Sequence, residues 1–599
     1  MRQVVGALLA ALMMACPGFA QTSPSASASK SAHRGKVTSQ TVSAQLDQMQ
    51  KAIETQQQQI QRLQQQVQSR DAVIQQLQQQ MSQVQSSSEQ AGQKADAAAS
   101  QSAQQGEQFA AVRNDVSDLK ANSTNTVLEL QETQKRINGL ESPLAIHVKG
   151  ITITPGGFLA AETVWRQHAL ASDINTPFNT IPFSGSSQNS MSEFFATGRQ
   201  SRVSLLAEGK LKEAKLTGYV EADWLSAGVT SNNNESNSYT MRQRQLWGQA
   251  ALRGWSFTGG QMWSLVTETK KGLDNRTEAL PMTIDPQYHV GFSWARQYGF
   301  RVVKDFHDKM WLGFSVENPQ TTLTSHGNAT NFLVGAAGAG GGLYNLNANY
   351  SFNSAPDLVF KAAFEPGIGH YEVFGILSQF RDRVFPNATA GTPSAVGAFN
   401  DSRTGGGVGA NARWSVMNKH IDFGLHFLGG EGIGRYGTSG LPDVTVRPDG
   451  TLALVRSYQS LGTLELHSKM WDVYMNAGGE YAGRTAFINS AGKGVGYGSP
   501  LFNNAGCTTE IIPGDAKGFT PGSLANCTGD TRNIIEGTFG IWYRLYKGEK
   551  GTLQFGPQYS YIVRHTWSGI GSLPGTPFIS GEPQGTENMF LTSFRYYLP

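Results

Sequence analysis

The chain has 599 residues, a formal net charge of +3 and only 16% charged residues, a balance that gives no argument for nucleic acid as a partner. Mean hydropathy is −0.33. Beyond the N-terminus, no segment holds the roughly 18 to 20 uninterrupted apolar residues that a membrane-spanning helix needs. This excludes a helical membrane protein but not a β-barrel, whose strands need only about 9 to 11 residues each, half of them apolar.

The first residues have the pattern of a secretory signal. Met1-Arg2 precedes an apolar run from Val4 to Cys16, and Pro17-Gly18-Phe19-Ala20 precedes Gln21. A charged start, an apolar middle and small residues before the cleavage site are typical of export. We expect residues 1–20 to be removed, and a short buried helix is the alternative.

A heptad repeat follows a polar lead. Residues 21–41 are rich in Ser, Ala, Thr and Lys without an apolar period, which indicates a flexible lead. From Val42, apolar residues recur at alternating steps of four and three, with Gln56 and Arg70 at two positions of the seam. The pattern predicts a coiled coil over 42–140 that associates with copies of itself, as a dimer or a trimer.

This coiled coil suits a stalk or tether. A continuous helix over 42–140 would be about 150 Å long at 1.5 Å per residue. We expect it to lie in the periplasm, where it can contact peptidoglycan or other periplasmic components. The opposing interpretation is one amphipathic helix packed on its own domain, for which the apolar seam is narrow and the surface rich in glutamine.

Two cysteines remain once the signal segment, with Cys16, is removed. Cys507 and Cys527 lie in one long connection. In an oxidising compartment such a pair most simply forms a local disulfide that pins a loop. A metal site at these cysteines is disfavoured because no histidine or further cysteine lies nearby with ligand spacing. No cofactor is expected.

From residue 156 to the C-terminus, short stretches of alternating apolar and polar residues recur, as in Ile421-Asp422-Phe423-Gly424-Leu425. Such alternation gives each strand one face for lipid and one for water, the pattern of an all-β transmembrane barrel. A further candidate strand, Leu343 to Ser351, would make the number of strands odd, whereas single-chain bacterial barrels have an even number, so we assign it to a loop. Eighteen strands are the alternative count. Sixteen antiparallel strands are expected near 156–166, 199–209, 213–225, 240–252, 255–265, 295–304, 308–317, 357–365, 370–380, 405–416, 420–429, 458–467, 471–483, 533–546, 550–565 and 587–598.

The links between these strands alternate in length. Short ones, such as Arg253-Gly254 and Met417-Asn418-Lys419, fall on one rim as periplasmic turns, and long ones, such as 167–198, 266–294 and 484–532, fall on the other. A soluble β-sandwich would not normally run to so many strands with such asymmetric loops. The expected order is signal 1–20, lead 21–41, periplasmic coiled coil 42–140, linker 141–155 and outer-membrane barrel 156–599.

A barrel of this size leaves a lumen wide enough for water. Basic and acidic residues on lumen-facing positions are about equally numerous, so their count does not predict ion selectivity. Alternation cannot orient strand 240–252, because Arg242 and Arg244 share a face with Leu246 and Leu252. The 266–294 link, with its two prolines, has the length of a loop that folds inward and narrows the channel.

Several short motifs resemble, in order and spacing, those of the DcaP-like outer-membrane porins. They are Gly198-Arg199-Gln200-Ser201-Arg202, Arg242-Gln243-Arg244 before Trp247-Gly248, Gly260-Gln261-Met262-Trp263-Ser264, Glu317-Asn318-Pro319-Gln320, Pro356-Asp357-Leu358-Val359 and Gly432-Ile433-Gly434-Arg435-Tyr436. The resemblance covers roughly 155 to 599. One departure is the C-terminal Tyr597-Leu598-Pro599, because such barrels usually finish on an aromatic residue that assists assembly.

The resemblance implies a trimer of sixteen-stranded barrels, with a periplasmic coiled coil that helps trimerisation. It also implies passive uptake of small, often anionic solutes such as dicarboxylates. By matching positions, it implies that six arginines line or approach the constriction: Arg199, Arg202, Arg242, Arg244, Arg296 and Arg301.

We therefore predict a trimeric porin, in contact with outer-membrane lipid, that passes small hydrophilic solutes and prefers anions. Catalysis is not expected, because no serine elbow and no Ser/His pairing is found among the 11 histidines. The alternative is a stalked surface adhesin or outer-membrane anchor that uses the coiled coil. It is disfavoured because about three quarters of the chain has the barrel pattern.

Overall fold

The structure is a computed structural model that describes residues 145–226, 239–327, 331–332, 350–389, 391–510, 527–572 and 577–599. The expected signal segment, lead and coiled coil lie outside the described residues, as does nearly all of the strand candidate at 343–351. Within the described ranges, no helix has the length and apolar character needed to cross a membrane.

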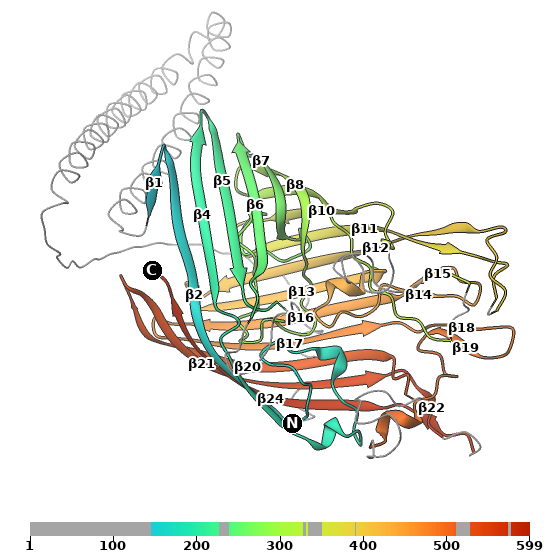
Figure 1. The fold of residues 1–599 in the computed structure, drawn as a ribbon. Coiled ribbons are helices and arrows are strands. Elements are labelled where there is room, and N and C mark those ends of the chain that lie inside the picture. Colours follow the sequence, from blue (N-terminus) through green and yellow to red (C-terminus); the bar gives the residue numbers. More distant parts are fainter. Residues whose placement is uncertain are drawn as a thin grey trace, which may run out of the picture. The chain divides into compact units, whose positions relative to one another are not determined.

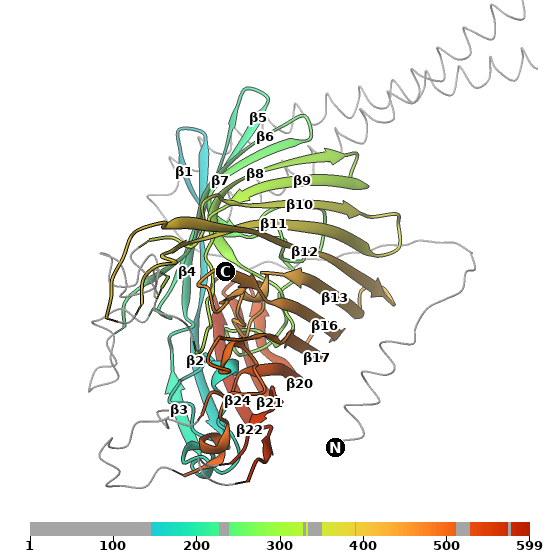
Figure 2. The ribbon, with the colours of Figure 1, turned by 90° about the vertical axis from the view of Figure 1, so that its right-hand side faces the viewer.

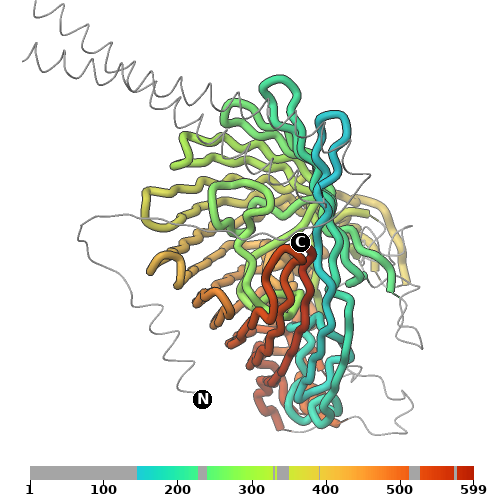
Figure 3. The backbone as a smooth tube through the Cα atoms, turned by 90° about the vertical axis from the view of Figure 1, so that its left-hand side faces the viewer, coloured from blue at the N-terminus to red at the C-terminus, as the bar shows by residue number. Residues whose placement is uncertain are grey.

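Long antiparallel strands form one closed sheet (Figure 1). Each pairs with the next long strand along the chain (Figure 2). The last of them, β24, pairs with the first, β2, from Phe158↔Tyr597 to Arg166↔Met589, so that blue and red strands lie side by side in Figure 3. The sixteen wall strands are β2 (Ile151–Arg166), β4 (Arg202–Leu211), β5 (Ala214–Asp223), β6 (Arg242–Leu252), β7 (Trp255–Trp263), β8 (Arg296–Phe306), β9 (Met310–Glu317), β10 (Asp357–Phe364), β11 (His370–Val384), β12 (Phe399–Val416), β13 (Ile421–Glu431), β16 (Arg456–His467), β17 (Trp471–Ala482), β20 (Thr531–Gly548), β21 (Gly551–Thr566) and β24 (Gln584–Tyr597).

Every expected strand is thus confirmed, and the barrel wall closes with sixteen long strands rather than eighteen. Two short strands extend the sheet by pairing with the parts of β2 that its long neighbours do not reach. β1 (Ile146–Val148) pairs with the start of β2, before the pairing with β24 begins, and β3 (Glu193–Thr197) pairs with the end of β2, beyond the pairing with β4. β1 and the start of β2 therefore lie within the expected linker 141–155. β3 lies in the 167–198 link, which was expected to hold no strand, because five residues before Gly198 are too few for alternation to stand out.

The links differ in structure as they do in length. Short links turn through residues with positive φ, such as Arg253 at 50° and Asn418 at 58°, a geometry that matches the twist of a tight hairpin. Short ladders and 3₁₀ helices occupy the long links on the other rim. They are β14 (Val444–Val446) with β15 (Leu452–Leu454), β18 (Thr485–Ile488) with β19 (Gly494–Tyr497), β22 (Gly569–Ile570) with β23 (Ser580–Gly581), and η1 (Phe178–Thr180), η2 (Gln188–Ser190), η3 (Gly434–Tyr436) and η4 (Ala505–Thr508).

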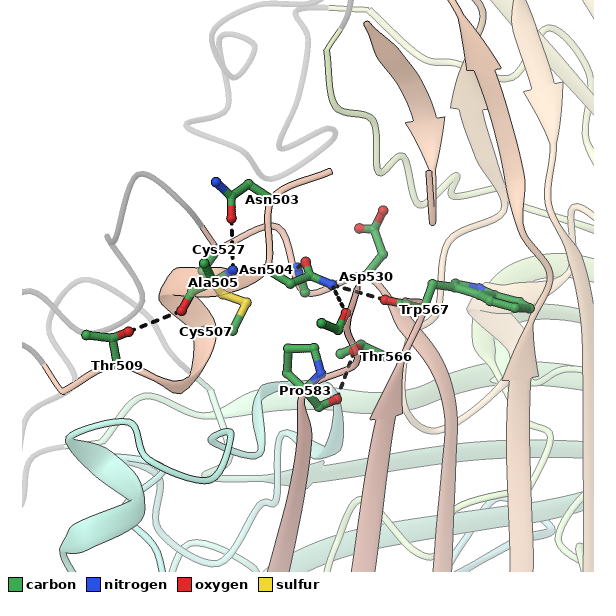
Figure 4. Close-up of a disulfide and its surroundings, with 12 residues drawn as sticks. Asn503, Asn504, Ala505, Cys507, Thr509, Cys527, Asp530, Thr566, Trp567 and Pro583 are labelled. Carbon is green, nitrogen blue, oxygen red and sulfur yellow. Dashed lines mark hydrogen bonds between the residues drawn. A yellow bond between two sulfur atoms is a disulfide. The ribbon is translucent and has the colours of Figure 1, made fainter. Parts of the chain in front are cut away.

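A disulfide joins Cys507, in η4, to Cys527, with their Cα atoms 4.6 Å apart (Figure 4). The neighbouring Asn504 donates from Nδ2 to the carbonyl oxygens of Trp567 and Gly581, each at 3.1 Å. The disulfide therefore closes a loop within the 483–530 link, and the Asn504 amide ties that link to the 567–583 link at the long-link rim.

Burial alternates along the wall strands. In β11, Val373 and Leu377 are 57% and 50% exposed, whereas Glu372 and Ser378 on the other face are buried. The exposed series is apolar in strand after strand and forms the surface that hydrocarbon would cover. Closure pairs the backbone groups of the wall, which hydrocarbon could not satisfy.

Substituting Phe360 by Arg tests this outer surface. Phe360 is 51% exposed on β10 and packs on Phe314 with ring centroids 4.8 Å apart. Arginine on the lipid face near the bilayer midplane costs about 2–4 kcal/mol. We expect that loss in the free energy of unfolding, measured by denaturant titration in lipid vesicles. Phe578→Arg, at a more exposed site (70%) in a long link, should leave the free energy of unfolding unchanged. Equal losses in both variants would refute the lipid assignment.

Candidate functional site

A β-bulge orients the start of β6. Glu221 of β5 pairs with Gln245 and Ala222 pairs with Gln243, so that Arg244 is an extra residue in the ladder. An extra residue places two consecutive side chains on one face. Arg244 and Gln245 are accordingly both buried, at 1% and 3% exposure, whereas the next residue, Leu246, faces outward.

The bulge determines which face of β6 points into the lumen, which alternation alone could not decide. Arg242 and Arg244 face the lumen although Leu246 and Leu252, at even spacing from them, are exposed on the outside. The Gln261 side chain donates from Nε2 to the carbonyl oxygens of Gln243 and Arg244, at 3.1 and 3.0 Å. A side-chain amide therefore satisfies backbone groups where the ladder to β7 has ended.

We use the name arginine cluster for Arg202, Arg242, Arg244 and Arg296 together with the two carboxylates of β5, Glu221 and Asp223. Arg244 donates from Nε to Glu221 at 2.7 Å and from Nη1 to Asp223 at 2.8 Å. Arg242 donates to both oxygens of Asp223, at 3.0 and 2.8 Å. Arg202 Nη1 lies 3.5 Å from Glu221 Oε2. Charge-assisted bonds of this kind hold the guanidinium planes in fixed orientations.

Arg296 differs from the other three arginines. Its guanidinium carbon lies 5.0 Å from the ring of Trp263 and 5.2 Å from that of Trp294. Its Nε and Nη1 are buried, and the described residues offer them no hydrogen-bond partner. Indole faces stabilise a cation without neutralising it. With four guanidinium groups and two carboxylates, the arginine cluster carries a formal charge of 4 − 2 = +2.

Two of the six arginines singled out from the sequence lie elsewhere. Arg199 donates from Nη1 to both oxygens of Asp173 at 2.9 Å and binds two carbonyl oxygens of the link after β5. Arg301 is buried against Asn275, at 2.7 Å, and the carbonyl oxygen of Trp263. Neither shares an ion-pair partner with the arginine cluster in the described part of the chain.

The 264–295 link folds into the barrel. Its backbone N–H groups at Ile284, Val290 and Gly291 donate to Gln558, Glu536 and Glu480, at 2.6, 2.8 and 2.9 Å. These acceptors belong to β21, β20 and β17, on the far side of the closed sheet from β7 and β8. The link therefore crosses the lumen, as its length and two prolines suggested.

Close contact with the far wall depends on a glycine. Gly291 has φ +90°, and a Cβ atom there would collide with the carbonyl oxygen of Ser460. Glycine is the residue that adopts this conformation and leaves room for the neighbouring backbone. A larger residue at 291 would move the link away from the wall.

Tyr288 connects this link to the arginine cluster. Its hydroxyl oxygen accepts a hydrogen bond from Arg244 Nη2 at 3.3 Å. Its ring packs against Trp263, Phe292 and Trp294, with centroids 5.4 to 5.8 Å apart. Nearby, burial raises the pKa of Asp285 to about 7, so this carboxyl carries only part of a negative charge at neutral pH.

Two cavities adjoin the arginine cluster. One, of about 520 Å³, is lined by Arg202, Glu221 and Tyr288 and reaches Asp472 and Tyr597, which lie next to short links. The other, of about 380 Å³, is lined by Arg242, Arg296 and Gln287 and by residues of a long link, among them Arg435 and Thr438. The cluster therefore lies between a space at each end of the barrel.

Sequence reasoning missed the residues that the inward link supplies, namely Tyr288, Trp294 and Gln287. A link has no alternation from which a direction can be deduced. Arg544 of β20 and Arg595 of β24, by contrast, line the larger cavity from regular wall strands. The one available signal for the link was the close spacing of its three aromatic residues, Tyr288, Phe292 and Trp294, because large rings of this kind usually pack against other residues.

No protein-family model matches the sequence, and no curated protein matches it. Among solved structures, the outer membrane channel DcaP of Acinetobacter baumannii matches with a TM-score of 0.50 at 13% identity, over 76% of this chain and 99% of that one. The chain has the DcaP fold. OmpT, an outer membrane protein of Vibrio cholerae, covers 76% of this chain and 99% of its own at 10% identity and a TM-score of 0.38. An anion-selective porin from Comamonas acidovorans matches over 75% of this chain and 100% of its own, at 9% identity and a TM-score of 0.38.

Removing Arg244 should destabilise the DcaP-like barrel. Arg244→Ala leaves two buried carboxylates without their shared partner, and breaking a buried ion pair costs about 3–5 kcal/mol. We expect that drop in the free energy of unfolding, measured in detergent by denaturant titration. Arg253→Ala breaks an ion pair with Glu213 whose side chains are 77% and 68% exposed, and it should change little. Equal effects of the two changes would contradict the description of the arginine cluster as a buried network.

Proposed function

We propose that the chain is an outer-membrane porin, a channel for passive diffusion of small hydrophilic solutes that prefers anions such as dicarboxylates. The observation that carries this proposal is the arginine cluster, with its formal charge of +2, lying between two cavities inside a closed barrel. The DcaP fold and the apolar outer surface support the outer membrane as its location.

Arg296 and Arg242 are the proposed contact points for an anion. Both line the smaller cavity, and Arg242 is 35% exposed although it is paired with Asp223. A planar guanidinium offers a carboxylate two parallel N–H donors. Because Arg296 has no carboxylate partner among the described residues, an anion that enters displaces no ion pair there. We propose that Arg202 and Arg244 continue the positive path, while Arg199 and Arg301 hold links in place.

The acidic members of the cluster have a role in this proposal. Glu221 and Asp223 fix the arginines and lower the net charge, which weakens the hold on an anion. Conduction requires attraction strong enough for entry and weak enough for release. A cluster of four unbalanced arginines would retain a dianion rather than pass it.

We further propose a homotrimer whose coiled coil, over 42–140, lies in the periplasm and contacts peptidoglycan or periplasmic components. The heptad repeat supports self-association. Contact with outer-membrane lipid follows from the exposed apolar surface.

Selectivity tests the proposed channel. In planar bilayers under a salt gradient, we expect the protein to conduct and its reversal potential to be that of an anion-selective pore. Arg296→Gln removes a charge with no carboxylate partner and should reduce the anion-to-cation permeability ratio by about twofold or more, which corresponds to ~0.4 kcal/mol. The matched change Arg253→Gln, in an exposed short link, should leave the ratio unaltered. An absence of conductance would reject the porin, and cation selectivity would reject the anion preference.

Substitutions in the heptad seam test the proposed trimer. Replacing Ile60 and Leu77 together by Asp places charges in the apolar seam, where they cost the most in a coiled coil. We expect chemical cross-linking of the full chain in detergent to give fewer trimers than the wild type. Gln57→Asp, beside the seam, is the control and should cross-link normally. Trimers that persist undiminished in the double variant would show that the heptads do not drive assembly.

A further inference from the structure

A group of metal-ligating side chains lies on the lumen face of the wall, away from the arginine cluster. It consists of Asp422 from β13 and of Glu465 and His467 from β16. One ligand atom from each of these residues lies within 4.8 Å of the others. The group is next to two short links, 417–420 and 468–470, and thus at the short-link rim.

The distances within this group match those between ligands of one ion. His467 Nε2 lies 3.5 Å from Asp422 Oδ2 and 3.4 Å from Glu465 Oε2. Charge-assisted N–H···O bonds are shorter, at about 2.7–2.9 Å. Two donor atoms at about 2.0–2.2 Å from a tetrahedral zinc ion are about 3.3–3.6 Å apart.

Glu465 gives a second, independent indication of a ligand. Its side chain is 1% exposed, and both carboxylate oxygens lack a hydrogen-bond partner among the described residues. Asp422 faces Glu465 directly in the β13–β16 register, and like charges in that position repel each other. A buried carboxylate without partners is costly unless a cation compensates it.

The basic residue beside Glu465 compensates only part of this charge. Arg413 Nη1 lies 3.7 Å from Glu465 Oε1, while its Nε donates to Glu268 at 2.9 Å. One guanidinium is therefore shared between two acids. Lys270 acts on Glu465 from beyond ion-pair distance, so among the described residues the Oε2 oxygen faces only His467 and Asp422 at close range.

Asp472 sets the orientation of the imidazole. His467 Nδ1 lies 2.9 Å from Asp472 Oδ1, across the β16–β17 register, and Arg544 Nη2 donates to the other oxygen of Asp472. With its proton on Nδ1, the ring presents the lone pair of Nε2 to Asp422 and Glu465. A carboxylate behind a histidine in this way is the usual support of a metal-ligating imidazole.

We propose that Asp422, Glu465 and His467 bind a divalent transition-metal ion of the Zn²⁺ type, with Asp472 as a positioning residue. One imidazole nitrogen and two carboxylate oxygens suit this ion and leave a fourth position for water. The bound ion links β13 to β16 beside two short links. The inference does not rest on the proposed transport function, because none of the three ligands belongs to the arginine cluster. The positioning residue Asp472 does line the larger cavity beside that cluster.

The test is a titration of the full-length, untagged protein, stripped of metal with a chelator, in detergent at neutral pH. By isothermal titration calorimetry we expect one Zn²⁺ per chain whose binding His467→Asn abolishes. Glu465→Gln and Asp472→Asn should weaken it, the latter about 10- to 100-fold. Co²⁺ serves as a spectroscopic probe: its visible absorption should appear on binding and disappear when Zn²⁺ displaces it.

His307→Asn is the matched control. His307 is exposed in another short link and has φ +58°, a conformation that asparagine also adopts, so Zn²⁺ binding should be unchanged. Circular dichroism checks that each variant keeps its β-sheet. If His467→Asn does not fold, Asp472→Asn and the Co²⁺ spectrum of the wild type decide the matter. Absence of saturable Zn²⁺ binding to the wild type would overturn the proposal and leave His467 as an imidazolium paired with carboxylates. Wild-type Zn²⁺ affinity in His467→Asn would also overturn it.

Discussion

Backbone pairing between β2 and β24 is the interaction on which the rest of the structure depends. A sheet left open there would expose two rows of N–H and C=O groups to hydrocarbon. Moving one such group from water into hydrocarbon without a hydrogen-bond partner costs on the order of several kcal/mol. The pairing from Phe158↔Tyr597 to Arg166↔Met589 removes both edges. Closure also fixes which residues meet inside, because the wall strands become one continuous surface with an inner and an outer face.

The inner face of the closed sheet is polar, and the 264–295 link satisfies much of it. Glu480, Glu536 and Gln558, on three successive wall strands, accept hydrogen bonds from backbone N–H groups of that link. Tyr288 and Phe292 of the link pack with Trp263 of β7 and Leu461 of β16 in one hydrophobic cluster. Among the described residues, the region around the arginine cluster is therefore packed and adjoins two cavities. The cluster is held by contacts from the wall on one side and from the link on the other.

Alternation predicted the wall because lipid on one side imposes a strict period of two on every strand. Met310 to Val316 and Leu553 to Val563 show that period without interruption, and their strands lie where it placed them. The same reasoning failed at Arg244, because a bulge breaks the period by one residue and leaves no sequence signal of its own. It also failed for Tyr288 and Trp294, whose positions depend on packing between a link and a wall far away in the sequence. The candidate site could therefore be predicted only as a set of strand residues, without the aromatic side chains that hold it.

The bulge also has a consequence for how the interior of such a barrel can change. Residue 244 has no partner in the β5–β6 ladder, so its loss would restore regular pairing while every other residue of β6 kept its side of the wall. A guanidinium could thus be added to or taken from the lumen by inserting or deleting one codon, with no substitution in the lipid-facing half of the strand. Homologous channels that differ in charge at this point need not differ anywhere else along β6.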